Sequence, residues 1–209
     1  MTGVQTCALP IWGSSALVSL GEGKENSLII APEVAAHYSF SKGSSKQTYP
    51  SSLMGRIALL RQTYLDAEWY RKEKKREEQN LSLEAWNDLQ DLPQIFDAGN
   101  KLNILRADKI GDEFGVQYVI NGATDGYQRI DELKKTDAAF VITLNFPKPY
   151  DVNDPYEADN VSLAQMKHWE LAPTNPGAFE SNGIIFALTA RGLKDKKVFW
   201  KNLRKAIAN

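Results

Sequence analysis

The chain has 209 residues, of which 43% are hydrophobic and 24% are charged. This composition can form a hydrophobic core and excludes a disordered chain, and the length suits one domain or a piece of a larger one. The net charge of −1 does not indicate binding to nucleic acid or to an anionic membrane. No apolar run is long enough to span a bilayer. One cysteine excludes a disulfide framework and a Cys-rich zinc site, and two histidines leave little material for a multi-histidine metal centre.

The first residues of the chain resemble a sequence artefact. When Thr2 to Ile11 are translated back through the genetic code, they match a common sequencing-library adapter without a break. The alternative is an ordinary N-terminal loop, but the length of the match favours the adapter. We therefore expect residues 1–12 to lie outside the fold. The only cysteine, Cys7, then falls in the artefact, and the lack of a signal peptide says nothing about export.

Residues 13–48 are predicted to form an irregular or extended insertion. Residues 13–26 are rich in Gly, Ser and Glu and predict a loop or a frayed end. Two short extended pieces are predicted over 27–31 and 34–40, followed by a flexible loop over 41–46.

Residues 49–209 are predicted to consist of β/α units. Apolar residues at three- and four-residue spacing predict a helix that begins after Ser52 and continues to residue 78. A second helix is predicted over 83–89, with Ser82 as its cap. Strands are then predicted over 92–96, 116–120, 138–144 and 184–189, and helices over 101–114, 127–135, from near 162, and over 195–208. Gly115 is expected to end the helix before it.

This alternation predicts an α/β fold. Strands that are apolar throughout, separated by amphipathic helices, indicate a parallel sheet covered on its faces. Consecutive β/α units fit a doubly wound sheet or part of a (β/α)₈ barrel. The alternation of strands and helices alone does not distinguish these two folds.

Candidate binding residues follow the predicted strands, because α/β sheets place their sites at the carboxyl ends of strands. They are Asp97, Asn121, Gly122, Asp125, Asn145, Thr189 and Arg191. Together these residues could bind a small polar ligand, although such residues also begin ordinary surface loops.

The turn from Gly122 to Gly126 follows a strand and precedes a helix, where backbone N–H groups can hold an anion. It lacks the dinucleotide-binding spacing and the P-loop lysine, which favours an ordinary turn over a phosphate cradle. For His37 and His168, far apart in sequence, we expect packing or surface roles. No acid–base–nucleophile trio is recognisable, so no catalytic residue is assigned.

Several stretches resemble the amidohydrolase superfamily, in its imidazolonepropionase-like branch, and especially large secreted amidohydrolases of environmental bacteria. The resemblance runs from Ala16 to Ile207 and is strongest over Tyr49–Gly55, Ala58–Ala67, Asn103–Asp108, Phe140–Pro147 and His168–Pro176. It implies a metal-dependent hydrolase of C–N bonds on a (β/α)₈ TIM-like barrel. This chain would supply the later strands and one long insertion, as a partial barrel truncated at both ends.

The resemblance also implies where metal ligands should lie. The family expects a His-x-His pair on the first strand, a His after each of the fifth and sixth strands, and an Asp after the eighth. The last three positions fall on Asp97, on Asn121 and near Arg191, so the expected ligand is missing at each. Asp97 could coordinate a metal alone, Asn121 only poorly, and Arg191 would repel a cation. The first-strand pair would lie before residue 13.

Catalytic zinc takes about three protein ligands and a water, whereas this segment offers at most one. We therefore expect no cofactor here, although the family uses zinc, and we expect the segment to be catalytically inactive and either structural or ligand-binding. One alternative is a competent enzyme whose other ligands lie in missing strands. Another is a stand-alone α/β binding module that uses the turn from Gly122 to Gly126.

The expected partners are the remainder of the same polypeptide, including a possible second amidohydrolase domain, and a small polar ligand. Nucleic acid and membranes are not expected. The resemblance suggests a periplasmic or secreted location.

Overall fold

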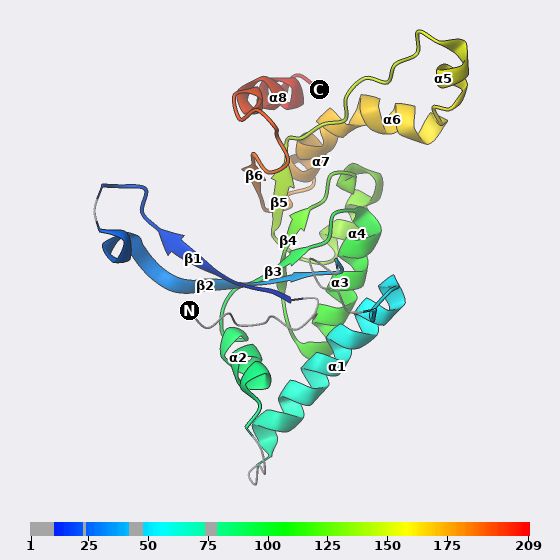
Figure 1. Cartoon of the computed structure of the whole chain (residues 1–209). Helices are drawn as coiled ribbons and strands as arrows, with labels where there is room; N and C mark the ends of the chain where they lie inside the picture. Colours follow the sequence, from blue (N-terminus) through cyan, green and yellow to red (C-terminus); the bar gives the residue numbers. More distant parts are fainter. Residues whose placement is uncertain (1–10, 23, 42–47, 74–78) are drawn as a thin grey trace. The chain divides into compact units, whose positions relative to one another are not determined.

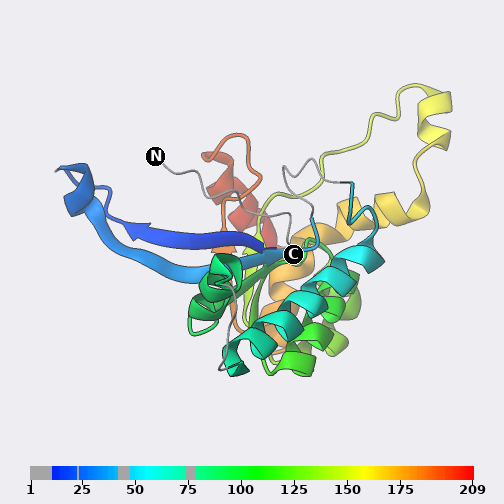
Figure 2. The same cartoon turned by 60° about the horizontal axis from the view of Figure 1, so that its bottom comes forward.

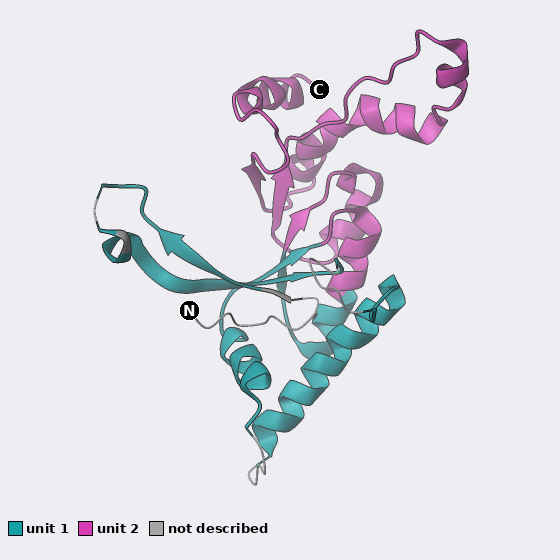
Figure 3. Cartoon of the chain, viewed as in Figure 1, with its two compact units in different colours: residues 1–97, 109–119 teal, residues 98–108, 120–209 magenta. Residues whose placement is uncertain are grey.

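The computed structural model describes residues 11–22, 24–41, 48–73 and 79–209. The chain divides into two compact units (Figure 3). Unit 1 comprises residues up to 97 together with 109–119, and unit 2 comprises 98–108 and 120–209. Among the residues that the structure describes, no helix has the length and apolar character needed to cross a bilayer. Cys7 and residues 1–10 of the suspected adapter lie outside the described residues, whereas Ile11 and Trp12 lie in a strand and not outside the fold as expected.

Unit 1 contains a long antiparallel ribbon (Figures 1 and 2). Strand β1 (Ile11–Val18) pairs with β2 (Ile29–Ser39), and the short 3₁₀ helix η1 (Glu25–Leu28) precedes β2. The far part of β2 pairs in parallel with β3 (Gln94–Asp97). The prediction of a loop over 13–26 was therefore wrong for residues 13–18, which are strand.

The two extended pieces predicted over 27–31 and 34–40 belong to one strand. The gap between them coincides with Pro32, and the pairing register shifts opposite this region, between Ser15 and Leu17 of β1. Proline cannot donate to a ladder and is tolerated at bulges, so the strand continues past it through an irregularity. The proline interrupts the sequence pattern of a strand, but that pattern does not show the pairing with β1 that continues on both sides of Pro32.

Side-chain N-caps mark where the first two α-helices of unit 1 begin. In α1 (Leu53–Lys72) the Ser52 hydroxyl accepts a hydrogen bond from the Gly55 nitrogen at 3.1 Å, which confirms the predicted start. The helix ends at Lys72, short of the predicted residue 78, and residues 74–78 lie outside the described part. In α2 (Leu81–Leu89) the cap is Asn80 and not the predicted Ser82, because the Asn80 side chain accepts from two backbone nitrogens, each at 3.1 Å.

An aromatic cluster forms the core of unit 1. Tyr38 of β2 packs against Trp86 of α2, Phe96 of β3 and Tyr118, with ring centroids 5.6, 6.4 and 5.7 Å apart. Tyr64 of α1 contacts Trp86 at 4.9 Å. These rings are buried and join the helices to the strands of this unit.

Unit 2 is built from parallel strands and helices. Strand β5 (Phe140–Thr143) pairs in parallel with the end of β4 (Tyr118–Gly122) and with β6 (Phe186–Thr189). Helix α3 (Lys101–Phe114), which gives its first half to this unit and its second half to unit 1, has the predicted bounds. Gly115 follows it with a φ of +69°, a left-handed conformation that ends helices. The prediction of a mixed α/β chain with parallel strands is confirmed.

The remaining helices of unit 2 differ from prediction in detail. The helix predicted over 127–135 is a 3₁₀ turn, η2 (Gly126–Arg129), followed by α4 (Ile130–Lys134). The predicted loop over 146–160 contains α5 (Pro155–Asp159), which Asp154 caps. Ser162 forms a capping box at the start of α6 (Leu163–Leu171), near the predicted start of this helix. The chain then continues through η3 (Ala172–Thr174), α7 (Asn175–Ser181) and α8 (Val198–Ile207).

The core of unit 2 centres on Phe179 of α7, which is fully buried. Its ring contacts Phe140 of β5 at 5.0 Å and Phe186 of β6 at 6.1 Å. A Cβ atom at Gly126 would lie 2.7 Å from the Phe179 ring, so the turn after β4 approaches this core closely. The core thus joins α7 to the first residues of β5 and β6 and to the turn after β4.

Candidate functional site

Asp97 is the one proposed site residue that lies in unit 1. It is the last residue of β3, opposite Ser39 of β2, and its side chain is half-buried. His37 lies on β2 opposite Ile95, two register positions earlier. Within the described ranges, no three His, Cys, Asp or Glu side chains come together in a way that could hold a metal ion.

Asn121 and Gly122 end strand β4 and support the neighbouring turn. The Asn121 carbonyl accepts a hydrogen bond from the Ala98 nitrogen at 3.1 Å. Gly122 has a φ of +122°, and a Cβ atom there would lie 2.8 Å from the Gly99 nitrogen. The turn after β3 therefore packs directly on Gly122, which gives this glycine a structural reason to be present.

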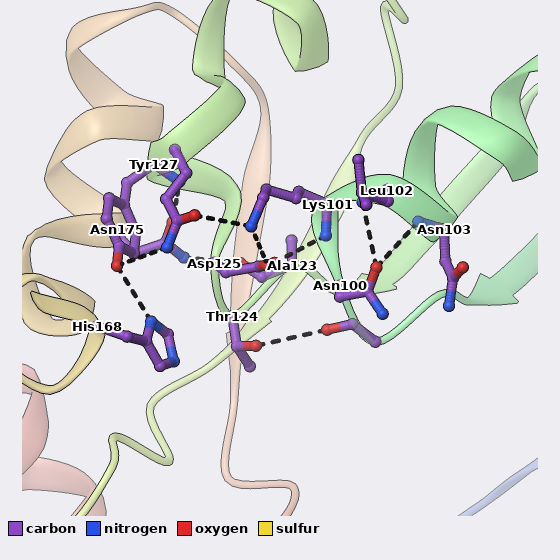
Figure 4. Close-up of polar contacts among 12 residues, drawn as sticks. Asn100, Lys101, Leu102, Asn103, Ala123, Thr124, Asp125, Tyr127, His168 and Asn175 are labelled. Atoms are coloured by element: carbon purple, nitrogen blue, oxygen red, sulfur yellow. Dashed lines mark hydrogen bonds and ion pairs between the residues drawn. The ribbon is translucent and has the colours of Figure 1, made fainter. Parts of the chain in front are cut away.

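Asp125 joins the turn after β4 to the start of α3 (Figure 4). Its carboxylate accepts hydrogen bonds from the Lys101 backbone nitrogen at 2.7 Å and from Lys101 Nζ at 3.0 Å. Asn100 Oδ1 accepts from the backbone nitrogens of Leu102 and Asn103 at 3.1 and 3.0 Å. The first N–H groups of α3 are thus already bonded, and a bound phosphate would meet the Asp125 carboxylate.

Two N–H groups at the end of this turn are also bonded within the protein. The Gly126 nitrogen donates to the Ala123 carbonyl at 3.2 Å, and the Tyr127 nitrogen donates to Asn175 Oδ1 at 2.8 Å. These bonds favour the ordinary turn over the phosphate cradle at residues 122–126.

Asn175 is a buried polar residue that the sequence pattern did not single out. Its Nδ2 donates to the Ala123 carbonyl at 2.8 Å while its Oδ1 accepts from Tyr127, so one amide holds both sides of the turn. Beside it the Tyr127 hydroxyl lies 3.1 Å from His168 Nδ1, and the two rings are stacked. The partners of Asn175 are 48 and 52 residues away in sequence, so no local signal could have identified it.

A groove of about 950 Å³ opens in unit 2 beside the loops that follow β4, β5 and β6. Asn145, one of the proposed site residues, lies in its wall on the loop after β5. The other lining residues are Thr124, Phe146, Pro147, Lys148, Pro149, His168, Gly192, Leu193, Lys194, Asp195, Val198, Lys201, Asn202 and Lys205. The carboxyl ends of parallel strands are where α/β proteins bind ligands.

Thr189 and Arg191 shape the loop beside this groove. The Thr189 hydroxyl accepts from the Arg191 nitrogen at 3.2 Å, and the Arg191 carbonyl accepts from the Thr143 hydroxyl. The Asn145 nitrogen donates to the same Thr143 hydroxyl at 3.2 Å. The structure therefore brings Asn145, Thr189 and Arg191 together, while Asn121, Gly122 and Asp125 support the turns around α3.

Lysines that the sequence analysis did not select dominate the charge of the groove. Its lining contains Lys148, Lys194, Lys201 and Lys205, and Asp195 is the one carboxylate among the lining residues. The spacing of Lys201 and Lys205 on a helix was visible in the sequence, but not that this face borders a groove.

Unit 2, with its parallel strands, intervening helices and a groove at the strand ends, has the architecture of α/β proteins that carry sites in strand-end loops. A scan against protein-family models and a search of curated proteins found no match. Among solved structures, the chain is similar to the crystal structure of an amidohydrolase from Thermotoga maritima MSB8, with a TM-score of 0.69 and 18% sequence identity. The match covers 96% of this chain and 53% of that chain, so this chain spans about half of that protein's length. The likeness shows an amidohydrolase-like fold.

Proposed function

We propose that the chain is part of an amidohydrolase of the imidazolonepropionase-like branch, and that this part is structural or ligand-binding and not hydrolytic. The fold similarity to an amidohydrolase and the family-like stretches from Tyr49 to Pro176 support the family. The expected partners remain the rest of the polypeptide and a small polar ligand.

The observation that carries the proposal is the chemistry at the three positions where the family places ligands. Asp97 offers a carboxylate, Asn121 offers a weakly coordinating amide, and Arg191 offers a cation. In unit 2 the other proposed carboxylate, Asp125, is bonded to Lys101 through both oxygens. Zinc in a hydrolase needs about three protein ligands and an open position for water. These residues do not fit the metal.

The competing proposal is a hydrolase in which Asp97 completes a metal site whose other ligands lie elsewhere in the parent polypeptide. The position of Asp97 at the carboxyl end of a parallel strand is what favours it. It differs from our proposal in one measurable respect, because it requires Asp97 to bind metal.

Metal content tests the two proposals. The chain and the parent polypeptide are each dialysed against zinc and then against metal-free buffer, and bound zinc is measured by plasma mass spectrometry. We expect no stoichiometric zinc in the chain, and no effect of Asp97→Ala on zinc in the parent. Asp112→Ala, which changes an exposed carboxylate on α3, is the control. Stoichiometric zinc that is lost in Asp97→Ala and retained in Asp112→Ala would overturn our proposal and favour the enzyme.

A further inference from the structure

We propose that the groove beside the loops after β4, β5 and β6 binds a small organic anion, a carboxylate or phosphate attached to an apolar body. This inference rests on the ligand-binding form of the proposed function, and it requires no metal. The residues that carry it are Asn145, Lys148, Lys194, Lys201 and Lys205.

The lysines converge on the groove from three separate segments. Lys148 lies on the loop after β5, Lys194 on the loop after β6, and Lys201 and Lys205 on adjacent turns of α8. The chain as a whole has a net charge of −1, so this concentration of positive charge is local. Lysine ammonium groups bind phosphate and carboxylate as point charges.

The charge of these lysines is not balanced within the groove. None of the ion pairs among the described residues involves the four groove lysines. The lining carboxylate, Asp195, accepts a hydrogen bond from the Lys197 backbone nitrogen at 2.9 Å. Like charges four residues apart on a helix repel one another, as Lys201 and Lys205 must. A bound anion would relieve that repulsion.

Lysines also occur on solvated helix faces. Here, in addition, specific contacts position α8 and the loop after β6 beside the groove. Asn202 Nδ2 donates to the Leu144 carbonyl at 2.7 Å and fastens α8 to the end of β5. Gly192, with a φ of +81°, lets the loop after β6 approach the Asn145 amide, since a Cβ atom there would lie 3.0 Å from Asn145 Nδ2. The Asn145 side chain therefore lies against the loop after β6 at the wall of the groove.

The groove also has an apolar wall. Phe146, Pro147, Leu193 and Val198 line it together with the lysines. Its volume of about 950 Å³ lies within the range of small-molecule sites, and such sites combine apolar walls with a few polar groups. The combination of cations, an amide and apolar side chains fits an organic anion better than an inorganic ion.

Calorimetric titration of the whole chain in chelator-containing, low-salt buffer tests the proposal with four probes. Phenyl phosphate and benzoate supply an anion with an apolar body, inorganic phosphate supplies the anion alone, and benzamide is the neutral analogue of benzoate. We expect phenyl phosphate and benzoate to bind more tightly than phosphate and benzamide. Affinity should fall with added salt, because screening weakens exposed charges.

The paired variant Lys201→Gln/Lys205→Gln should raise the Kd for phenyl phosphate about tenfold, a loss of 1.4 kcal/mol. Lys134→Gln/Lys135→Gln removes two exposed lysines outside the groove and should leave the Kd unchanged. Circular dichroism checks that both variants are folded, and Lys148→Gln gives an independent variant outside α8.

Equal effects of the two paired variants, equal binding of benzoate and benzamide, or no binding of any anion would overturn the proposal. Vesicles containing phosphatidylserine form a separate arm. Binding to vesicles without binding to phenyl phosphate would also overturn it, by assigning the lysines to lipid headgroups. Because every titration is metal-free, the anion site can fail while the zinc experiment still supports the proposed function.

Discussion

Asp125 accepts two hydrogen bonds from Lys101, one from the backbone nitrogen and one from the ammonium group, at 2.7 and 3.0 Å. Both side chains are largely shielded from solvent, with exposed fractions of 16% and 23%. The carboxylate therefore bonds the first turn of α3 and pairs with the charge on the same residue. Asp125 of the turn after β4 and Asn100 thus together bond the first N–H groups of α3.

Removing this carboxylate should destabilise the protein. We expect Asp125→Ala to lower the free energy of unfolding by about 1–3 kcal/mol. The substitution removes a helix-terminal acceptor and the charged partner of the Lys101 ammonium, which keeps Gln128 Oε1 as an acceptor at 2.7 Å. Asp125→Asn keeps an acceptor oxygen and should cost less. Urea denaturation measures both, and Glu132→Gln, which disrupts an exposed ion pair with Arg129, is the control. If Asp125→Ala leaves the urea midpoint unchanged, the carboxylate is free for another role.

Asn175 of α7 supports the turn after β4, so its removal should destabilise the protein. Asn175→Ala leaves the Tyr127 N–H without its partner and leaves the Ala123 carbonyl with the Gly126 nitrogen as its donor, so we expect a loss of about 1–3 kcal/mol. Asn182→Ala removes a bond to the Ala178 carbonyl in its own helix and should cost much less. Thermal and urea unfolding of the two variants, compared side by side, give the difference. Similar losses in both would show that the bridging bonds contribute little.

Gly122 and Gly177 provide a matched pair of glycines in unit 2. Gly122→Ala should destabilise the protein by about 1–3 kcal/mol, because a side chain is strained at a φ of +122° and would meet the Gly99 backbone. Gly177 lies in α7, and a Cβ atom there would have no neighbour within 4 Å, so Gly177→Ala should raise stability by about 0.5 kcal/mol. Urea midpoints should therefore move in opposite directions. A tolerated Gly122→Ala would show that the turn after β3 does not require a glycine at this position.

Local signals predicted the elements whose boundaries depend on nearby residues. Ser52 and Ser162 mark helix starts that their side chains cap, and Gly115 ends α3 through its left-handed backbone. The same kind of signal misled at α2, where Asn80 and Ser82 are both good caps and only the fold shows which one bonds the helix. Strand β1 was missed because its backbone partners lie in β2, beyond the reach of any local pattern.

The candidate site was less predictable for the same physical reason. Asn145 follows an apolar strand, and that position placed it at the wall of the groove. The lysines of α8 line the groove because the fold packs this helix beside the end of β5. The hydrogen bond from Asn202 to the Leu144 carbonyl is one contact that holds the helix there. Nothing in the order of residues 194–205 distinguishes a groove wall from a solvated helix face.

Buried tyrosines in unit 1 should make stability depend on alkaline pH. Burial raises the pKa of Tyr38, Tyr64 and Tyr118 above the ordinary value of 10.0. The Tyr118 hydroxyl, 2.7 Å from the Tyr64 hydroxyl, raises the pKa of Tyr64 further, while hydrogen bonding with Tyr38 opposes the rise. Below pH 10 all three are protonated in both states, so their full contribution to stability is present there. Above pH 10 the unfolded chain releases protons that the folded chain retains, so stability falls as pH rises.

The expected slope is about 1.4 kcal/mol per pH unit for each of these tyrosines above pH 10. Urea midpoints measured from pH 8 to pH 11 give the slope, and tyrosinate absorbance of the folded protein follows the ionisation directly. Tyr64→Phe should reduce the slope, whatever its effect on stability at pH 8. Tyr156→Phe should not, because the Tyr156 side chain is 83% exposed on α5. Equal slopes in the unsubstituted chain and in Tyr64→Phe would contradict this prediction. They would mean that the cluster opens to solvent before it ionises, because tyrosines in an open cluster have the same pKa as in the unfolded chain.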